Sequence, residues 1–171
     1  MLRLAKAFLD IALWRRTPAH LPASLFLLAL VACAAALMEV LGEFLGPGPH
    51  DGILSSVALG VGLPLAFAGA VLALARRRAR FLQTATALLG VGILAELILY
   101  PLGAAYRAFG EDSLVSIPAR ILLCVGLIWY LLACAHIWRS ALDSGLLLGG
   151  IISVGYLLLS IAIEQQMLAH A

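Results

Sequence analysis

Three ionisable residues interrupt long apolar runs of this sequence and are its first candidates for chemistry. Glu39 lies in "ALMEVLGEF", Glu96 in "GILAELILYP" and Arg120 in "IPARILLC". Placing a charged side chain inside a bilayer costs free energy unless the charge is paired or faces water. Each of these residues is therefore a candidate for a functional role. Three alternatives are open: a Glu–Arg pair that holds helices together, an ion or proton site, or side chains that snorkel to the membrane surface.

Helical spacing predicts that these three side chains share one depth. Glu96 follows Arg80 by sixteen residues, which is about 24 Å at 1.5 Å per helical residue. Glu39 has a similar height on the first apolar run, and Arg120 lies near the outer start of the fourth. A short connection places the third and fourth runs side by side. We therefore expect Glu96 to pair with Arg120 and an intramembrane polar cluster to include Glu39.

A second polar group is predicted near the inner face of the membrane. It comprises Gln83, Thr84 and Thr86 on one apolar run and His136 on the next. Side chains of this kind hydrogen-bond between helices in membranes. The alternative is a metal or haem held by His136 and His20, which requires both imidazoles to face one cavity. We expect interhelical bonding, with no metal and no cofactor.

Cysteines and sequence motifs give no sign of catalysis. Cys33, Cys124 and Cys134 all lie in apolar runs without a CxxC motif, which is typical of small buried residues. The sequence contains no phosphate loop, HExxH, GxSxG or paired acidic motif. The sequence therefore predicts a protein that is not an enzyme.

The composition requires lipid as the main solvent. The chain of 171 residues is 64% hydrophobic and 12% charged, with a mean hydropathy of +1.08, whereas soluble domains are roughly 45–50% apolar and about 25% charged. A soluble fold of this size could not bury so much apolar surface. The net charge of +2 does not indicate nucleic-acid binding, and no basic patch alternates with aromatic residues.

Five apolar stretches are long enough to cross a bilayer, whose core of about 30 Å needs roughly 20 helical residues. Their length and lack of alternation exclude strands of a β-barrel. The short connections predict an all-α, polytopic bundle of five transmembrane helices, forming a single membrane domain over residues 1–171. The predicted spans are 21–44, 53–75, 81–102, 114–138 and 145–163, with Pro22 opening the first and Pro101 and Gly103 ending the third.

The basic residues predict the orientation of the bundle. Loops on the cytoplasmic side of membrane proteins carry an excess of Lys and Arg. With a cytoplasmic N-terminus, only Arg107 and Arg120 of the eleven basic residues lie outside. This predicts a multi-pass membrane protein with an external C-terminus. The topology anchor consists of Arg15, Arg16, Arg76, Arg77, Arg78 and Arg80, and the other inner basic residues are Arg3, Lys6 and Arg139.

The first twenty residues predict a short amphipathic helix in the inner interface. Leu4, Phe8, Leu9 and Ile11 share one broad face, and Arg3, Lys6 and Asp10 share another. A short solvated helix without a membrane role is the alternative.

Small residues recur at four-residue spacing in two spans. Such stripes let helix backbones approach closely, either within one bundle or between copies. We expect packing within the bundle. The residues are Gly62, Ala66 and Ala70 in the second span and Gly145, Gly149 and Ser153 in the fifth.

The chain resembles the Yip1 family of small five-span membrane proteins, in an uncharacterised bacterial branch. The likeness lies in the layout of the spans and in "WRRTPAHLPAS" (14–24), "ARFLQTATALLGVGIL" (79–94) and "AHIWRSALDSGLLLGGIISVGYLLLS" (135–160). The resemblance implies a five-span fold and a role in membrane organisation, and it supplies no catalytic residues.

Three functions are compatible with these features. The first is a non-enzymatic membrane protein that organises or assists a membrane complex, membrane trafficking or homeostasis. Its partners would be the lipid bilayer and other membrane proteins or copies of itself. The second is a small transporter or channel component that uses Glu96 and Arg120. The third is a cofactor-binding subunit for electron transfer.

Overall fold

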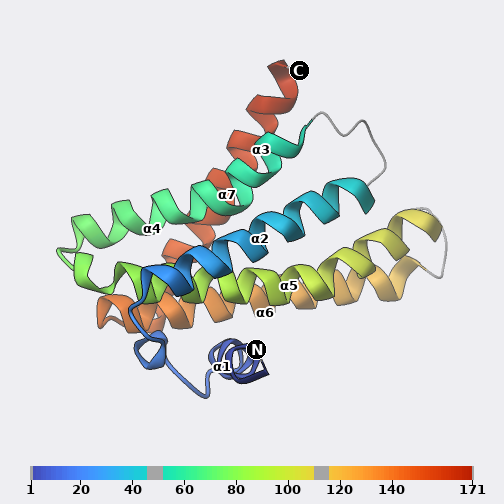
Figure 1. Ribbon diagram of the computed structural model, residues 1–171. Helices are drawn as coiled ribbons and strands as arrows, with labels where there is room; N and C mark the ends of the chain where they lie inside the picture. The colour runs from blue at the N-terminus through green and yellow to red at the C-terminus, as the bar shows by residue number, and fades with distance from the viewer. Residues whose placement is uncertain (1, 46–51, 110–115, 171) are drawn as a thin grey trace.

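The computed structural model describes residues 2–45, 52–109 and 116–170, and these residues form helices joined by short turns (Figure 1). No strand occurs in these ranges. The elements in chain order are α1 (Leu2–Ala12), η1 (Pro18–His20), α2 (Leu25–Leu45), α3 (Ile53–Val57), η3 (Ala58–Gly62), α4 (Leu63–Leu74), η4 (Arg78–Arg80), α5 (Phe81–Phe109), α6 (Ser116–Leu142) and α7 (Leu146–His170).

Five helical segments of the described chain are long and apolar enough to cross a membrane. They are α2, the continuous segment α3–η3–α4, and α5, α6 and α7. Their surfaces carry large apolar side chains: Phe26, Leu54 and Leu74 are 77%, 83% and 86% exposed. Water would penalise that much exposed apolar surface, whereas lipid would not. The predicted all-α bundle is confirmed.

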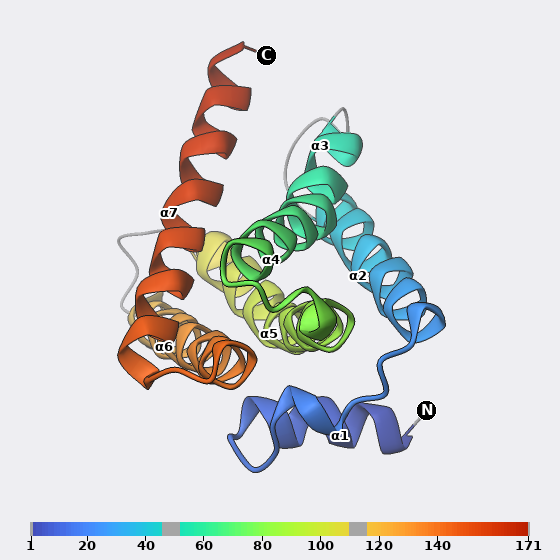
Figure 2. The ribbon, with the colours of Figure 1, turned by 90° about the vertical axis from the view of Figure 1, so that its left-hand side faces the viewer.

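Helix α5 lies at the centre of the bundle and packs against α1, α2, α4 and α6 (Figure 2). Helix α7 packs mainly on α6 and runs at a steep inclination to α2 and α5 (Figures 1 and 2). The close α6–α7 contact is at Gly149, where a Cβ atom would be 2.3 Å from the backbone oxygen of Ala135. The two backbones touch there because glycine has no side chain to hold them apart.

The third predicted span continues past its predicted end. Helix α5 runs through Pro101 and Gly103 and stops only at Phe109. A proline removes one backbone hydrogen bond but does not prevent a helix from continuing when the surrounding sequence and packing support it. Leu102, Ala104 and Ala105 follow Pro101 and are good helix formers.

The second span matches its predicted bounds to within one residue, whereas the first and fourth differ by about one turn at one end and the fifth by about two turns. Helix α2 begins at Leu25 rather than in a first turn opened by Pro22, because Ser24 takes the capping position and accepts a bond from the Leu27 N–H at 3.4 Å. Helix α6 covers Ser116–Leu142 and α7 covers Leu146–His170, so both continue beyond the predicted ends.

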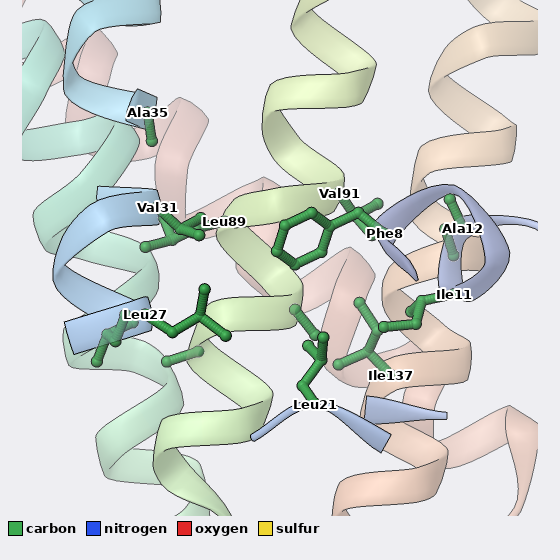
Figure 3. Packing of buried hydrophobic residues seen from close by; sticks show 14 residues of the cluster. Phe8, Ile11, Ala12, Leu21, Leu27, Val31, Ala35, Leu89, Val91 and Ile137 are labelled. Carbon is green, nitrogen blue, oxygen red and sulfur yellow. The ribbon is translucent and has the colours of Figure 1, made fainter. Parts of the chain in front are cut away.

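Helix α1 packs its apolar face against α5 and α6 (Figure 3). Phe8, Ile11 and Ala12 are buried in the main apolar cluster, and Ile11 lies beside Ile137 of α6. The Phe8 ring occupies the space over Gly90 of α5, where a Cβ atom would be only 2.4 Å away. Lys6 is exposed as predicted, whereas Leu9 is 46% exposed and the Asp10 side chain only 13%, so these two residues do not lie on their predicted faces.

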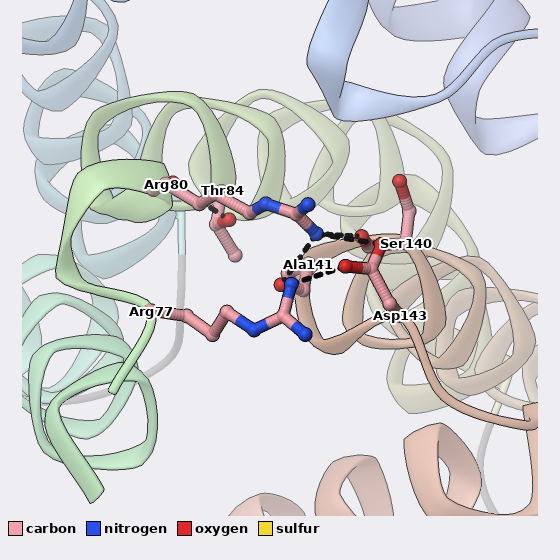
Figure 4. A network of polar contacts seen from close by, with 6 residues as sticks. All are labelled: Arg77, Arg80, Thr84, Ser140, Ala141 and Asp143. Carbon is pink, nitrogen blue, oxygen red and sulfur yellow. Dashed lines mark hydrogen bonds and ion pairs between the residues drawn. The ribbon is translucent and has the colours of Figure 1, made fainter. Parts of the chain in front are cut away.

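One end of the bundle, which we call the basic end, holds the ends of α4 and α6 and the start of α5. Arg77 and Arg80 both bind the Asp143 carboxylate, with 2.8 Å between Arg80 Nη1 and Asp143 Oδ1 (Figure 4). Arg80 Nη1 also donates to the Ser140 and Ala141 carbonyls at 2.9 and 3.1 Å. A cation at the last carbonyls of a helix is favourable because these groups form the negative end of the helix dipole.

Candidate intramembrane site

A cavity of about 150 Å³ lies inside the bundle, between α2, η3, α4, α5, α6 and α7. Along α5 it extends from Leu88 to Glu96, which is about 12 Å at 1.5 Å per residue. The lining is mainly apolar and aromatic, with two carboxyl groups at the end farther from the arginines. The lining residues that bear polar or aromatic groups are Glu39, Phe67, Glu96, Tyr130, Cys134, Trp138, Ser153 and Tyr156.

The two carboxyl groups of the cavity lie next to each other. Glu39 of α2 and Glu96 of α5 both line the cavity and interact electrostatically. Tyr100 Oη donates to Glu39 Oε2 at 3.3 Å. Glu96 Oε2 is buried and has no hydrogen-bond partner among the described residues.

Gly60 brings the backbone of the second span against the Glu39 carboxyl group. It lies in η3, a single π-helical segment between the α-helical turns of α3 and α4. A Cβ atom at Gly60 would be 1.8 Å from Glu39 Oε1, so any other residue here would displace the Glu39 carboxyl group. Isolated π-helical turns occur frequently at functional sites, where they rearrange the local backbone.

Polar groups continue from this carboxyl pair toward the end of the bundle opposite the arginines. Glu43 lies one turn after Glu39 on α2, and its Oε2 atom accepts a hydrogen bond of 3.0 Å from Ser56 Oγ of α3. Glu43 and Glu39 also interact electrostatically. Glu96, Glu39 and Glu43 therefore form a line of carboxyl groups from the cavity toward the far end of α2.

Arg120 is not part of the carboxyl pair, and the predicted Glu96–Arg120 pairing is wrong. Arg120 Nη2 donates to Tyr106 Oη at 3.2 Å, and the guanidinium carbon lies 5.4 Å from the centre of the Tyr106 ring. Among the described residues no ion pair joins Arg120 to Glu39 or Glu96.

The continuation of α5 explains why the depth argument failed for Arg120. Arg120 lies four residues, about 6 Å, from the start of α6, whereas Glu96 lies thirteen residues, about 20 Å, before the end of α5. Since α5 continues to Phe109, its last turns and not Glu96 face the start of α6.

The side chains of the predicted inner polar group hydrogen-bond to backbone carbonyls and do not bond to one another in a single cluster between helices. Gln83 Nε2 donates to the Leu21 carbonyl at 2.7 Å, so it ties the segment before α2 to α5. Thr84 and Thr86 hydroxyls donate to carbonyls one turn earlier in their own helix, those of Arg80 and Leu82. The sequence identified these residues as polar and buried but could not show their partners.

His136 ties the segment after α1 to α6. Its Nε2 atom lies 3.0 Å from the Arg16 carbonyl and must donate, because a carbonyl only accepts, and its ring stacks on Trp14 at 5.6 Å between centres. The Nδ1 atom is buried without a partner among the described residues. His20 contacts Thr17 instead, so the two imidazoles serve separate local contacts.

The remaining predicted residues lie at the surface or in helix contacts. Arg15, Arg16, Arg76 and Arg78 are exposed, and Arg16 Nε lies 3.4 Å from Asp10 Oδ2. Gly149 and Ser153 of the fifth-span stripe are buried, and Gly145 is exposed. Gly62, Ala66 and Ala70 are all exposed, so the second-span stripe faces away from the bundle and does not pack within it.

Sequence reasoning missed the aromatic lining and Gly60. Tyr130, Trp138 and Tyr156 come from two helices, and a hydropathy pattern does not indicate which aromatic residues of different helices face one cavity. Within α6, however, the sequence did contain a signal. Tyr130, Cys134 and Trp138 follow one another at four-residue spacing and therefore lie on one helix face.

No family model, curated protein or solved structure matches this chain. The Yip1-like resemblance therefore stays a prediction.

Proposed function

We propose that this protein is a membrane carrier that binds a small cation in its internal cavity and exchanges it for a proton. The observation that supports this proposal is the buried Oε2 atom of Glu96, which has no partner among the described residues and lies in a cavity beside the Glu39 carboxyl group. Intramembrane carboxyl groups that face a cavity are typical of ion and proton pathways.

Electrostatics favours exchange at this carboxyl pair. Two like charges in one cavity repel each other, and they do so more strongly where water does not screen them. A proton on one group removes the repulsion, and a bound cation compensates for it. The pair therefore favours holding either a proton or a cation, so that binding of a cation expels the proton. Glu43 and Ser56 supply polar groups between the pair and the end of the bundle opposite the arginines.

The proposal also includes the membrane in which the protein lies and its orientation in that membrane. We propose the bacterial inner membrane, with the basic end of the bundle in the cytoplasm. The cluster formed by Arg77, Arg80 and the exposed Arg76 and Arg78 supports this orientation, because cytoplasmic loops are rich in arginine and lysine.

Proteoliposomes with an acidic interior and an enclosed pH-sensitive dye test the exchange. We expect external Na⁺, K⁺ or tetramethylammonium to make the interior more alkaline at least tenfold faster with the parent protein than with Glu96→Gln. Glu164→Gln changes an exposed acid on α7 and serves as the matched control. A parent protein no faster than protein-free vesicles with all three cations overturns the proposal.

A second candidate is the organising role predicted from the sequence. The exposed apolar groove along α7, lined by Leu147, Ile151, Val154 and Leu158, supports it because such a surface can contact another membrane protein. Purification from native membranes in a mild detergent tests this role. A defined partner that is lost in Ile151→Ser supports it, and recovery of the chain alone contradicts it.

A further inference from the structure

We infer that the cation bound in this cavity is an organic ammonium ion with small apolar substituents, held between aromatic rings and the Glu39–Glu96 pair. The inference rests on the proposed function only in assigning a cation to this cavity. The inference requires only that the cation binds and does not require that it is transported. Experiments can therefore contradict the inference and the proposed function independently.

Aromatic side chains from three helices form a continuous wall of the cavity. The Phe67 ring of α4 lies 5.9 Å from the Trp138 ring of α6 and 5.3 Å from the Tyr156 ring of α7, measured between ring centres. All three residues line the cavity, and Tyr130 of α6 lines it as well. Aromatic faces attract cations and are the usual means by which proteins recognise methylated ammonium groups.

The aromatic wall and the carboxyl pair are near enough to act on one ligand. Tyr156 interacts electrostatically with both Glu39 and Glu96, and Tyr130 interacts with Glu96 and Tyr156. Counted along the helices, Tyr130 and Tyr156 lie between the inner part of the wall and the carboxyl pair. A cation in this cavity therefore has both tyrosine side chains and both carboxyl groups in the wall around it.

The size and lining of the cavity exclude other classes of ligand. An apolar cavity of about 150 Å³ can hold one benzene-sized molecule, and this cavity has the same volume. A bare divalent metal ion needs about six oxygen ligands, whereas the two carboxyl groups, Glu39 and Glu96, stand in a lining that is otherwise mainly apolar and aromatic. Methyl groups on an ammonium ion instead match the aromatic and aliphatic lining. A phosphate or carboxylate ligand would be repelled by Glu39 and Glu96.

Tryptophan fluorescence can report binding directly because Trp138 lines the cavity. In the full-length protein, Trp14→Phe and Trp129→Phe leave Trp138 as the only tryptophan. The purified protein in detergent is titrated with tetramethylammonium chloride, with NaCl at equal ionic strength, and with tert-butanol as a neutral compound of similar shape. We expect a saturable fluorescence change with tetramethylammonium alone.

Two substitutions test the two halves of the site. Glu96→Gln and Tyr156→Leu should each weaken tetramethylammonium binding at least tenfold, whereas Tyr156→Phe should retain it because the ring remains. Glu164→Gln should bind as the parent does, and size-exclusion chromatography confirms that each variant is folded. No saturable change in the folded parent, or equal binding by Tyr156→Leu, overturns the inference.

The same measurements separate this inference from the proposed function. Binding of tetramethylammonium without proton exchange in vesicles supports the inference and contradicts transport. Proton exchange driven by Na⁺ or K⁺ without binding of tetramethylammonium supports transport and overturns the inference.

Discussion

Asp143 is the residue on which the basic end of the bundle depends. It follows α6 in a left-handed conformation, with φ of 50°, which aspartate tolerates better than most residues. Its carboxylate accepts hydrogen bonds from Arg80 and from Arg77, which lower its pKa from 3.8 to about 2. One exposed carboxylate thus joins the end of α4, the start of α5 and the end of α6.

The lowered pKa of Asp143 predicts how the stability of the folded protein changes with pH. Because the folded-state pKa lies below the unfolded one, ionised Asp143 stabilises the folded state above pH of about 4, and this contribution disappears as pH falls toward about 2. Thermal unfolding of the detergent-solubilised protein should therefore depend on pH less steeply between these values in Asp143→Asn than in the parent. Asparagine also accepts the left-handed conformation, so the backbone is unchanged. Identical pH profiles would contradict this assignment.

At the scale of elements, the π-helical segment η3 brings Gly60 into contact with Glu39 and determines the shape of the acidic end of the cavity. Gly60→Ala would place a Cβ atom 1.8 Å from Glu39 Oε1, so the carboxyl group must move. Because the carboxyl group is the far end of a flexible side chain, it can move at little cost in stability. We expect a loss of tetramethylammonium binding for Gly60→Ala with little change in melting temperature.

Gly62→Ala is the matched control because Gly62 lies in the same π-helical segment and an added Cβ atom would have nothing within 4 Å of it. This variant should keep binding and be as stable as the parent or slightly more so, since alanine favours helices over glycine. Equal behaviour of the two variants would show that Gly60 does not position Glu39.

The close contact between α6 and α7 leads to a second prediction at the scale of elements. Gly149→Ala would place a Cβ atom 2.3 Å from the Ala135 backbone oxygen, and backbone cannot move aside as a flexible side chain can. We expect a loss of about 1–3 kcal/mol in the free energy of unfolding, measured by thermal or denaturant unfolding in detergent.

The neighbouring Gly150→Ala serves as the control, because nothing lies within 4 Å of the added atom. It should be neutral or stabilising by up to about 1 kcal/mol. If Gly149→Ala is equally harmless, then α7 is not held on α6 through this glycine.

At the scale of the whole molecule, five spans and the arginine distribution predict that the termini lie on opposite sides of the membrane. Reporter fusions after Arg78 should behave as cytoplasmic, and fusions after Gln166 as external. Fusions after Arg139, where α6 ends, should again be cytoplasmic. A cytoplasmic signal after Gln166 would show that the steeply inclined α7 does not cross the bilayer.

The sequence by itself determined the properties that depend on one segment at a time. Apolar length sets whether a helix can cross a bilayer, so the five candidate spans could be read directly, and Glu39 and Glu96 stood out as charges within them. The tertiary structure decided what depends on several segments together. Whether α5 stops at Pro101 depends on the support of its neighbours, and this moved Arg120 away from Glu96.

The cavity is the clearest case of this difference. Phe67, Tyr130, Trp138 and Tyr156 lie on three helices and meet only because α4 and α6 pack on α5 and α7 packs on α6. Similarly, Gly60 contacts Glu39 only because one π-helical turn changes which face of the second span meets α2. Hydropathy is a property of single segments, whereas a binding site is defined by distances between segments, and those distances are set by packing.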